Sequence, residues 1–467
     1  MTKIALIPID NRPICYDLIQ DVLALDNDIE LFMPKIEYLG GLQTSANIEK
    51  IFEFLSDLNE IDYLIVSLDT LAYGGLVNSR RCDDGFETIK NRIEKFKELA
   101  FKKCKKVLAF SSIMRISNNN INEEEKEYWA QWGKRIFDWS YYLHKSEVEK
   151  TANCVINKVP DEILADYIKT RKRNFEINKI YLNLAQEGFF DTLIFSKDDC
   201  AEFGLNVKEA NELQKEVDEK NIQNVLIKTG ADEIPLALVT RALAQNQNIK
   251  INPVFIEENG KNKISKYEDI SLFDCVKSQI EIANCLVNEK NFDLTLLINN
   301  FKNEQGDLVL GDIINNIDKE IDFLKTPYFI ADTNNANGAD CNFIHQLFKQ
   351  NLDNFYGYCG YNTSANTLGC AIFCAVVKFL ALKKNSYNNI AFEKIQAIRF
   401  LDDWAYQAIS RKFVRENASD FKKALEIKKE ELNKNFEKIS KFLDYKPEKI
   451  EYSLPWDRSF EIRIKLG

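Results

Sequence analysis

The chain has 467 residues, more than one hydrophobic core usually holds, so two or three domains are expected. A composition of 45% hydrophobic and 29% charged residues is that of a soluble globular protein. The net charge of −10 argues against a nucleic-acid partner, which would require a basic stripe. No apolar run approaches the ~20 residues that cross a bilayer, so we expect no membrane partner.

The first residues, MTKIALIPID, lead directly into a strand, so we expect no signal peptide and a cytoplasmic location. The eleven cysteines are scattered and fit reduced thiols in that compartment. The only histidines, His144 and His345, lie in no recognisable motif, which excludes a zinc site built on several imidazoles. We therefore assign no metal and no cofactor, and expect carboxylates, tyrosines or lysines to carry acid–base chemistry.

In chain order, short apolar runs predict about ten strands separated by segments of helical periodicity. The predicted strands are Lys3–Ile9, Glu30–Met33, Asp62–Ser67, Lys106–Ser111, Leu193–Phe195, Val225–Lys228, Val254–Glu257, Leu294–Ile298, Tyr328–Ala331 and Phe355–Tyr358. This repetition favours an α/β protein with mostly parallel sheets in two doubly wound, Rossmann-like lobes. The alternative is a (β/α)8 barrel with insertions.

The predicted first lobe covers residues 1–125 and the second covers residues 186–385. A helical insertion spans residues 126–185, and its aromatic residues are more typical of a core than of a sugar-binding platform. Residues 386–467 form a charged helical segment with an adjacent acidic pair, Asp402 and Asp403, and a tail. That tail, Leu454–Glu461, is predicted to dock back onto the body of the protein.

The first strand runs into Asp10 and Arg12. Pro13 forces Arg12 into an extended conformation, so the arginine projects from a rigid turn. This pattern is compatible with a simple turn that holds an Asp–Arg pair. It is equally compatible with a clamp for an anion or a hydroxyl group at the end of a strand.

The third and fourth strands also end in polar loops. The third leads into SLDTLAYGGLVNSR, which contains Asp69, Tyr73 and Arg80 and a glycine pair that lets a ligand approach the backbone closely. A plain turn does not need these side chains together. The fourth strand is followed by Arg115. Both loops therefore indicate substrate binding.

The stretch Leu193–Glu209, LIFSKDDCAEFGLNVKE, carries the clearest chemical pattern. A buried strand ends in Asp198 and Asp199, and a helix follows Gly204. In α/β enzymes, ligands bind at such strand-to-helix loops. The alternative interpretation of the pair is a helix cap with a structural hydrogen bond.

Later strand ends are also polar, and their asparagines suit a ligand with many hydroxyl groups because amides donate and accept hydrogen bonds. One acidic loop, GADE, could simply cap its helix. The complete set of predicted substrate-binding residues is Asp10, Arg12, Asp69, Tyr73, Arg80, Arg115, Asp232, Glu233, Asp332, Asn337, Asn362 and Asn366.

The motifs PIDNRP, SLDTLAYGGLVNSR, FSSIMR, TRKRN, KDDCAEFG, GADE, NNANGAD, GYNTSANTLG and RFLDDW follow one another along nearly the whole chain. As a set they resemble a bacterial family of proteins of unknown function, domain family 4127. The resemblance implies that these loops belong to one shared site. It implies no activity, so the chemistry is inferred from the residues.

We predict a hydrolase for a small polyhydroxylated substrate, of the glycosidase type, because glycoside hydrolysis uses two carboxyl groups that flank the bond. The acidic pair looks like that of N-acetylhexosaminidases. Asp198 would orient the substrate's acetamido group, and Asp199 would protonate the leaving oxygen. Two adjacent charges raise one pKa, as a general acid requires.

Two alternatives remain. The first is a hydrolase or lyase that uses Mg²⁺ or Mn²⁺ on a phosphorylated or carboxylated small molecule, with Arg12, Arg80 and Arg115 holding the anion. The second is a non-catalytic, two-lobed sugar-binding protein. In each case the partner is a small molecule, and the oligomeric state stays open.

Overall fold

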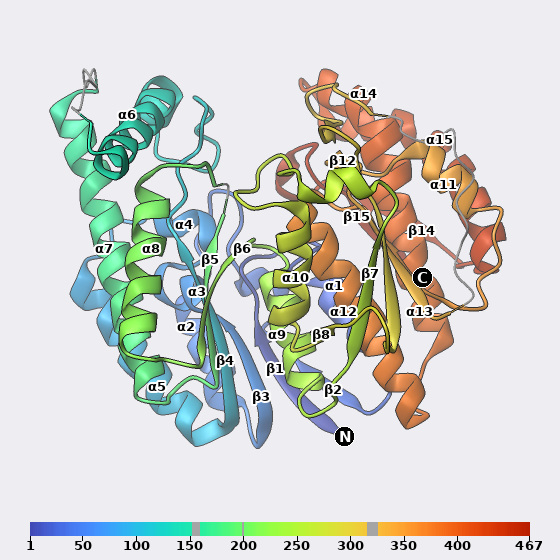
Figure 1. Cartoon of the computed structure of the whole chain (residues 1–467), viewed down its shortest axis with the longest axis horizontal. Coiled ribbons are helices and arrows are strands. Elements are labelled where there is room, and N and C mark those ends of the chain that lie inside the picture. Colours follow the sequence, from blue (N-terminus) through green and yellow to red (C-terminus); the bar gives the residue numbers. More distant parts are fainter. Residues whose placement is uncertain (152–158, 199, 315–325) are drawn as a thin grey trace. The chain divides into compact units, whose positions relative to one another are not determined.

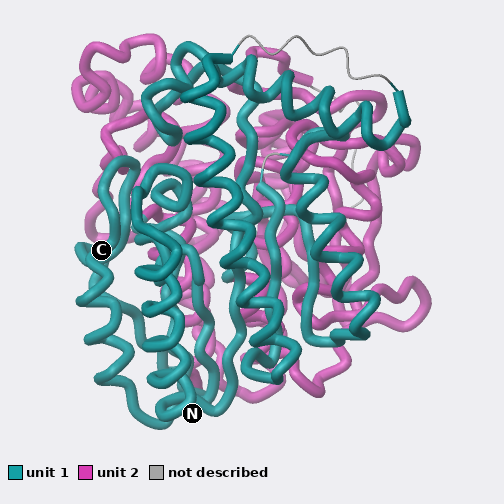
Figure 2. Tube along the Cα trace, turned by 90° about the vertical axis from the view of Figure 1, so that its left-hand side faces the viewer, with its two compact units in different colours: residues 1–11, 30–235 teal, residues 12–29, 236–467 magenta. Residues whose placement is uncertain are grey.

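The computed structural model describes residues 1–151, 159–198, 200–314 and 326–467, which fold into two compact α/β units (Figures 1 and 2). Unit 1 comprises residues 1–11 and 30–235, and unit 2 comprises residues 12–29 and 236–467. The described strands form two main sheets that are mostly parallel, which confirms the predicted fold class.

Unit 1 is built on a six-stranded sheet with the order β2-β1-β3-β4-β5-β6. The strands are β1 (Thr2–Ile7), β2 (Ile29–Phe32), β3 (Ile61–Ser67), β4 (Cys104–Ile113), β5 (Thr192–Lys197) and β6 (Val225–Thr229). Each pairing from β1–β3 to β5–β6 is parallel. The apolar runs of these strands are buried, as the continuous hydrophobic pattern of a parallel sheet requires.

The helices of unit 1 connect these strands. They are the 3-10 turn η1 (Ile36–Tyr38), α2 (Ile48–Asp57), α3 (Leu68–Tyr73), α4 (Leu76–Arg81), α5 (Phe86–Lys103), α6 (Trp129–Glu149), α7 (Asp161–Gln186) and α8 (Leu205–Glu219). Asn47 caps α2 by accepting a hydrogen bond from the Lys50 N–H. The aromatic residues of α6 and α7 form a core around Trp129 and Tyr167, in agreement with the predicted packing role.

Unit 2 contains a five-stranded parallel sheet with the order β13-β11-β9-β7-β8. Its strands are β7 (Lys250–Phe255), β8 (Leu286–Val287), β9 (Leu294–Asn299), β11 (Tyr328–Asp332) and β13 (Phe355–Cys359). Two small sheets accompany it. They pair β10 (Gly306–Asp307) with β12 (Asn335–Ala336), and β14 (Ile450–Ser453) with β15 (Arg463–Leu466).

The helical elements of unit 2 are α1 (Asp17–Leu23), η2 (Glu258–Asn262), α10 (Leu272–Ile282), α11 (Cys341–Leu347), α12 (Ser364–Lys384), α13 (Asn389–Arg399), the π-helical η3 (Phe400–Ser410), α14 (Arg411–Glu416), α15 (Phe421–Leu443) and η4 (Pro455–Asp457). Helix α12 is the one helix in the described part of the chain that is long and apolar enough to cross a membrane, and 89% of its apolar window is buried. Burial of this kind is typical of a core helix.

The division between the units lies elsewhere than the sequence predicts. Residues 186–235 were expected in the second lobe, but β5 and β6 extend the first sheet by parallel pairing with β4. The division therefore falls between Pro235 and Leu236, within α9 (Ile234–Leu243). Helix α1, expected in the first lobe, packs against α12 and α13 of unit 2.

Thr70 ties the loop after β3 to the end of β1. Its buried hydroxyl lies 2.7 Å from the Pro8 carbonyl oxygen, to which it donates. We expect Thr70→Val to lower the free energy of unfolding of unit 1 by ~1–3 kcal/mol, because a buried carbonyl loses its donor. Thermal unfolding followed by circular dichroism measures this, with Thr70→Ser as the control that keeps the hydroxyl. Equal Tm values for the Val and Ser variants would contradict the prediction.

Candidate functional site

The candidate site of unit 1 lies at the carboxyl edge of its sheet. Because β1, β3, β4, β5 and β6 are parallel, the segments that follow them emerge at the same edge. The sequence-predicted residues on these segments are Asp10, Asp69, Tyr73, Arg80, Arg115, Asp198, Asp232 and Glu233. Open α/β sheets bind ligands at this edge.

Two short helices position the residues of the loop after β3. Ser67 caps α3 by accepting a hydrogen bond from the Thr70 N–H. Gly74 ends α3 in the left-handed conformation, with φ of +88°, where a Cβ atom would collide with the Ser45 hydroxyl. The sharp reversal at this glycine starts α4 at once and brings Arg80 to the same edge as Asp69.

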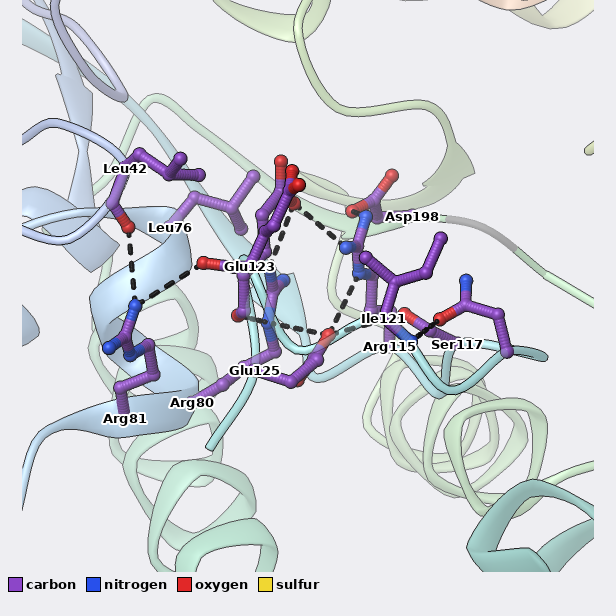
Figure 3. A network of polar contacts seen from close by, with 12 residues as sticks. Leu42, Leu76, Arg80, Arg81, Arg115, Ser117, Ile121, Glu123, Glu125 and Asp198 are labelled. Atoms are coloured by element: carbon purple, nitrogen blue, oxygen red, sulfur yellow. Dashed lines mark hydrogen bonds and ion pairs between the residues drawn. The ribbon is translucent and has the colours of Figure 1, made fainter. Parts of the chain in front are cut away.

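Arg80 and Arg115 share a cluster of carboxylates (Figure 3). Arg115 Nη2 lies 2.8 Å from Glu124 Oε2, and Arg115 Nη1 lies 3.3 Å from Asp198 Oδ2. Arg80 contacts Glu124 and Glu125 at 3.4 and 3.3 Å. Glu125, which is 5% exposed, also accepts a hydrogen bond from the Ser117 hydroxyl at 3.2 Å. We call these five charged residues the Arg–Glu cluster.

The Arg–Glu cluster holds two positive and three negative side chains, so neither arginine presents an uncompensated charge. Within the described residues, the neighbouring Arg81 donates only to the carbonyl oxygens of Leu42 and Glu123 (Figure 3). Arg12, the third arginine of the predicted anion clamp, lies in unit 2, where Glu461 accepts from it at 3.2 Å. All three arginines of that clamp are thus engaged by carboxylates of the protein itself.

Asp69 is 2% exposed and accepts a hydrogen bond from the Ser112 N–H at 2.9 Å. Burial raises the pKa of Asp69 to about 6, and the Ser112 bonds and the charge of Arg80 offset only part of that effect. The hydroxyl groups of Tyr73 and Tyr181 are buried nearby and have no hydrogen-bond partner within the described ranges. Asp69 is therefore an acid of raised pKa beside two buried hydroxyl groups.

Helix α7 completes this edge with residues of the TRKRN motif and beyond. Arg173 and Asn174 both donate to the Ser79 carbonyl oxygen at 2.9 Å, which fixes the end of α4. Asn178 donates to the Ser112 carbonyl oxygen and accepts from the Ser111 hydroxyl. Arg173 and Asn174 of the motif thus position α4, Asn178 positions the end of β4, and Lys172 is exposed to solvent.

The remaining acidic residues of unit 1 differ in environment. Glu233 is fully buried and accepts from the Ala231 N–H at 3.1 Å, so it folds back onto its own turn. Asp10 and Asp232 are also buried. Asp199, one of the two predicted catalytic residues, lies outside the described residues. Within the described ranges, no group of three or more His, Cys, Asp or Glu side chains is arranged to hold a metal ion.

The carboxyl edge of the unit 2 sheet holds Asp332 at the end of β11. Its carboxylate accepts hydrogen bonds from Asn299 Nδ2 at 2.8 Å, from the Asp340 N–H at 2.8 Å and from the Tyr358 hydroxyl at 2.9 Å. Burial and the nearby Asp340 carboxylate raise the pKa of Asp332. Three donors make Asp332 a structural centre of this edge, and Asp340 caps α11.

The predicted asparagines of unit 2 also hold loops. Asn337 and Asn362 adopt left-handed conformations, and the Asn337 N–H donates to the Asn362 carbonyl oxygen at 2.7 Å. Asn337 Nδ2 donates to Asp307 at 3.1 Å. The Asn366 N–H donates to the Thr363 hydroxyl that caps α12. Turn geometry explains the first two asparagines, because asparagine tolerates positive φ.

The acidic pair of the RFLDDW motif lies in the π-helical segment η3. Arg399 donates to Asp402 at 2.7 Å and to Asp403 at 3.2 Å, and Asp403 also accepts from the Gly360 N–H at 2.8 Å. Burial raises the pKa of Asp403 despite the Arg399 charge. The π-helix presents both carboxylates to the Arg399 guanidinium, and the hydrogen bond from the Gly360 N–H connects η3 to the residue that follows β13.

The chain matches the family model described as "Protein of unknown function (DUF4127)" over residues 4–465, and it belongs to that family. Comparisons with curated proteins and with solved structures gave no match. Membership confirms the resemblance carried by the loop motifs, and the family's description brings no activity with it.

Because the pKa of Asp69 is raised, the stability of unit 1 should depend on pH. Its folded pKa lies above the ordinary 3.8, so its contribution to stability is present below about pH 4 and is lost as pH rises through about 6. We expect Asp69→Asn to gain stability relative to the wild type between pH 4.5 and 7.5, by ~3 kcal/mol at most. Thermal unfolding across this pH range measures the difference.

Asp62→Asn is the control, because the hydrogen bond from Lys105 lowers the pKa of the half-buried Asp62 below 3.8. The contribution of Asp62 to stability is lost only as pH falls below about 4, so the difference between this variant and the wild type should stay nearly constant between pH 4.5 and 7.5. A pH-independent difference for Asp69→Asn would contradict the assigned protonation.

The Arg–Glu cluster depends on Arg115. We expect Arg115→Met to destabilise unit 1 by about 1–3 kcal/mol, because it leaves Glu124, Glu125 and Asp198 with one guanidinium between them. Chemical denaturation measures the loss, and Arg81→Met is the matched control that removes an arginine bonded only to carbonyl oxygens. A similar loss in both variants would rule out a special role for the cluster.

Proposed function

We propose that this member of the DUF4127 family is a hydrolase of the glycosidase type that acts on a small polyhydroxylated substrate at the carboxyl edge of the unit 1 sheet. The observation that carries the proposal is a pair of carboxyl groups in unlike environments. Asp69 is buried with a pKa of about 6, whereas Asp198 is paired with Arg115 at 3.3 Å. Unlike environments are how one site holds an acid and a base at the same pH.

In this proposal Asp69 is the general acid. A carboxyl group with a pKa of about 6 keeps its proton in most molecules below pH 6, and in that state it can transfer the proton to a leaving oxygen. Asp198 is the partner carboxylate, held in position by the Arg115 guanidinium. Asp69 takes the general-acid role in this proposal because burial raises its pKa, whereas Asp199, the acid predicted from the sequence, lies outside the described residues.

We propose a one-step mechanism for this edge. Asp69 follows β3 and Asp198 follows β5, and β4 lies between them. Inverting glycosidases use two carboxyl groups that are far enough apart to leave room for a water molecule, and carboxyl groups from two non-adjacent strands suit that requirement. Asp198 would then activate this water while Asp69 protonates the leaving group.

The polar groups beside Asp69 support a substrate with many hydroxyl groups. The buried hydroxyl groups of Tyr73 and Tyr181 can donate to or accept from a sugar hydroxyl. The alternative, a metal-dependent enzyme that acts on an anionic substrate, receives less support from this edge. Its arginines, Arg80 and Arg115, already form ion pairs with the carboxylates of Glu124, Glu125 and Asp198.

The test is a screen of the purified protein against aryl-glycosides, including N-acetylhexosaminides, with and without EDTA. We expect hydrolysis that EDTA does not abolish. Asp69→Asn and Asp198→Asn should each lower kcat by ~10²–10⁴-fold while the substrate still binds. Asp62→Asn, at the start of β3 and outside the proposed site, is the control and should retain wild-type kcat.

Two results would overturn the proposal. Loss of activity with EDTA would favour the metal-dependent hydrolase or lyase. Tight sugar binding without turnover, unchanged in Asp69→Asn, would favour the non-catalytic binding protein.

A further inference from the structure

Unit 2 contains a stack of alternating arginine and aromatic side chains that the proposed function does not use. Arg12 lies over the Trp456 ring at 5.1 Å, and Arg458 lies over the same ring at 4.5 Å. Arg458 also lies over the Phe460 ring at 4.9 Å, and Arg411 lies over that ring at 4.7 Å. We call these five residues the arginine ladder. Three of them come from the tail that the sequence predicts to dock back.

The three arginines of the arginine ladder differ in their carboxylate contacts. Glu461 forms ion pairs with Arg12 at 3.2 Å and with Arg458 at 3.3 Å. Arg411 is 7% exposed and has no carboxylate within ion-pair distance in the described part of the chain. Its Nη1 donates to Gln407 Oε1 at 2.9 Å, and its buried Nε has no partner there.

An arginine in this state is costly, because a buried charge without a counter-charge loses its hydration. The other buried arginines of the cluster and motif regions do not share this state: Arg399 binds two aspartates, and Arg171 binds Glu209 at 2.8 Å. Burial lowers the pKa of Arg411, and the charges of Tyr406 and Glu461 offset only part of that effect, whereas the Asp403 and Asp402 carboxylates outweigh burial and raise the pKa of Arg399. Arg411 thus differs from its buried counterparts in charge compensation.

The position of Arg411 is nevertheless fixed. Gln407 Nε2 donates to Asp402 Oδ1 and to the Phe460 carbonyl oxygen, each at 3.1 Å. These bonds fix the orientation of the Gln407 amide, and therefore the position of the Oε1 atom that accepts from Arg411. The Tyr406 hydroxyl donates to the Ser459 carbonyl oxygen at 2.8 Å and anchors the same tail. The guanidinium is held in one orientation on a rigid frame.

The tail that supplies the aromatic rings also carries backbone strain. Trp456 and Asp457 adopt left-handed conformations, with φ of 59° and 47°. Bulky residues rarely take this conformation, and such strain persists where the surrounding contacts impose it, often at ligand sites. The rings of Trp456 and Phe460 are only partly buried, so each keeps some accessible surface.

We propose that the arginine ladder is a binding site for a small oxyanion, a carboxylate or phosphate group, with Arg411 as the residue that recognises it. The planar guanidinium fork matches both groups and binds them through two parallel hydrogen bonds. The anion supplies the counter-charge that Arg411 lacks, and the partly exposed rings contact the rest of the ligand. This site is independent of Asp69 and Asp198, so each proposal can fail alone.

The experiment measures the Tm of the full chain in sodium phosphate and, separately, in sodium acetate, against sodium chloride at equal ionic strength; neither oxyanion is a polyhydroxylated ligand of the unit 1 site. We expect at least one oxyanion to raise the Tm in a saturable way, and calorimetric titration to show one site. The two arms decide whether the group recognised is a phosphate or a carboxylate. No specific rise with either oxyanion would overturn the proposal.

Variants locate the site. Arg411→Met should weaken binding by about tenfold or more, because a charge-assisted fork is lost. In chloride alone its Tm should equal or exceed that of the wild type, since an uncompensated buried charge is removed. Lys412→Gln, an exposed neighbour on the same helix, removes the same charge outside the ladder and should bind as the wild type does.

A purely structural arginine predicts the reverse pattern, with a lower Tm for Arg411→Met in chloride and no oxyanion effect in the wild type. Unchanged binding in Arg411→Met would also overturn the assignment. If Arg411→Met does not fold, Arg411→Lys decides: it keeps the charge and loses the planar fork, so binding should still weaken, and full wild-type affinity would exclude recognition by the fork.

Discussion

The parallel pairing of β4 with β3 and β5 determines where the chemistry of unit 1 can occur. It places the ends of three strands at one edge, and with them Asp69, Arg115 and Asp198. The Ser112 N–H, at the end of β4, then binds Asp69 directly. Separate loops of a parallel sheet become one surface because every strand ends on the same side.

Charge compensation decides what the arginines of this chain can do. Arg80 and Arg115 are surrounded by Glu124, Glu125 and Asp198, so their charges organise the protein's own carboxylates. Arg411 lacks such a partner in the described ranges, although it is just as buried. The same residue type therefore positions a carboxylate in unit 1 and can recognise an external one in unit 2.

Local sequence pattern predicts the strands well and their assembly less well. Apolar runs bounded by turn residues locate nearly every strand of both main sheets. The assignment of β5 and β6 to the first sheet depends on pairing with β4, a long-range contact that no local window contains. The two-residue strands β10 and β12 and the π-helical η3 likewise carry no periodicity of their own.

The residues of the candidate site could likewise be predicted only in part from the sequence. Asp69, Arg80, Arg115 and Asp198 are identifiable because each follows a predicted strand end. Glu124 and Glu125 are not, because they lie in a polar run without periodicity, where charges usually face solvent. Arg411 is hidden in a charged helical segment for a similar reason.

The carboxylates at the edges of the two sheets differ more in their hydrogen bonds than in their burial. Asp332 and Asp403 are as buried as Asp69, but each is held by protein donors on both carboxylate oxygens. A carboxylate in that state stabilises the loops around it and has little capacity left for a ligand. Asp69 lies beside two tyrosine hydroxyl groups that the described protein leaves without partners. Buried polar groups without partners are rare in stable folds. Such atoms also occur beside the unit 2 carboxylates, on Asn299 and Arg399, but there the carboxylates themselves are already held by protein donors.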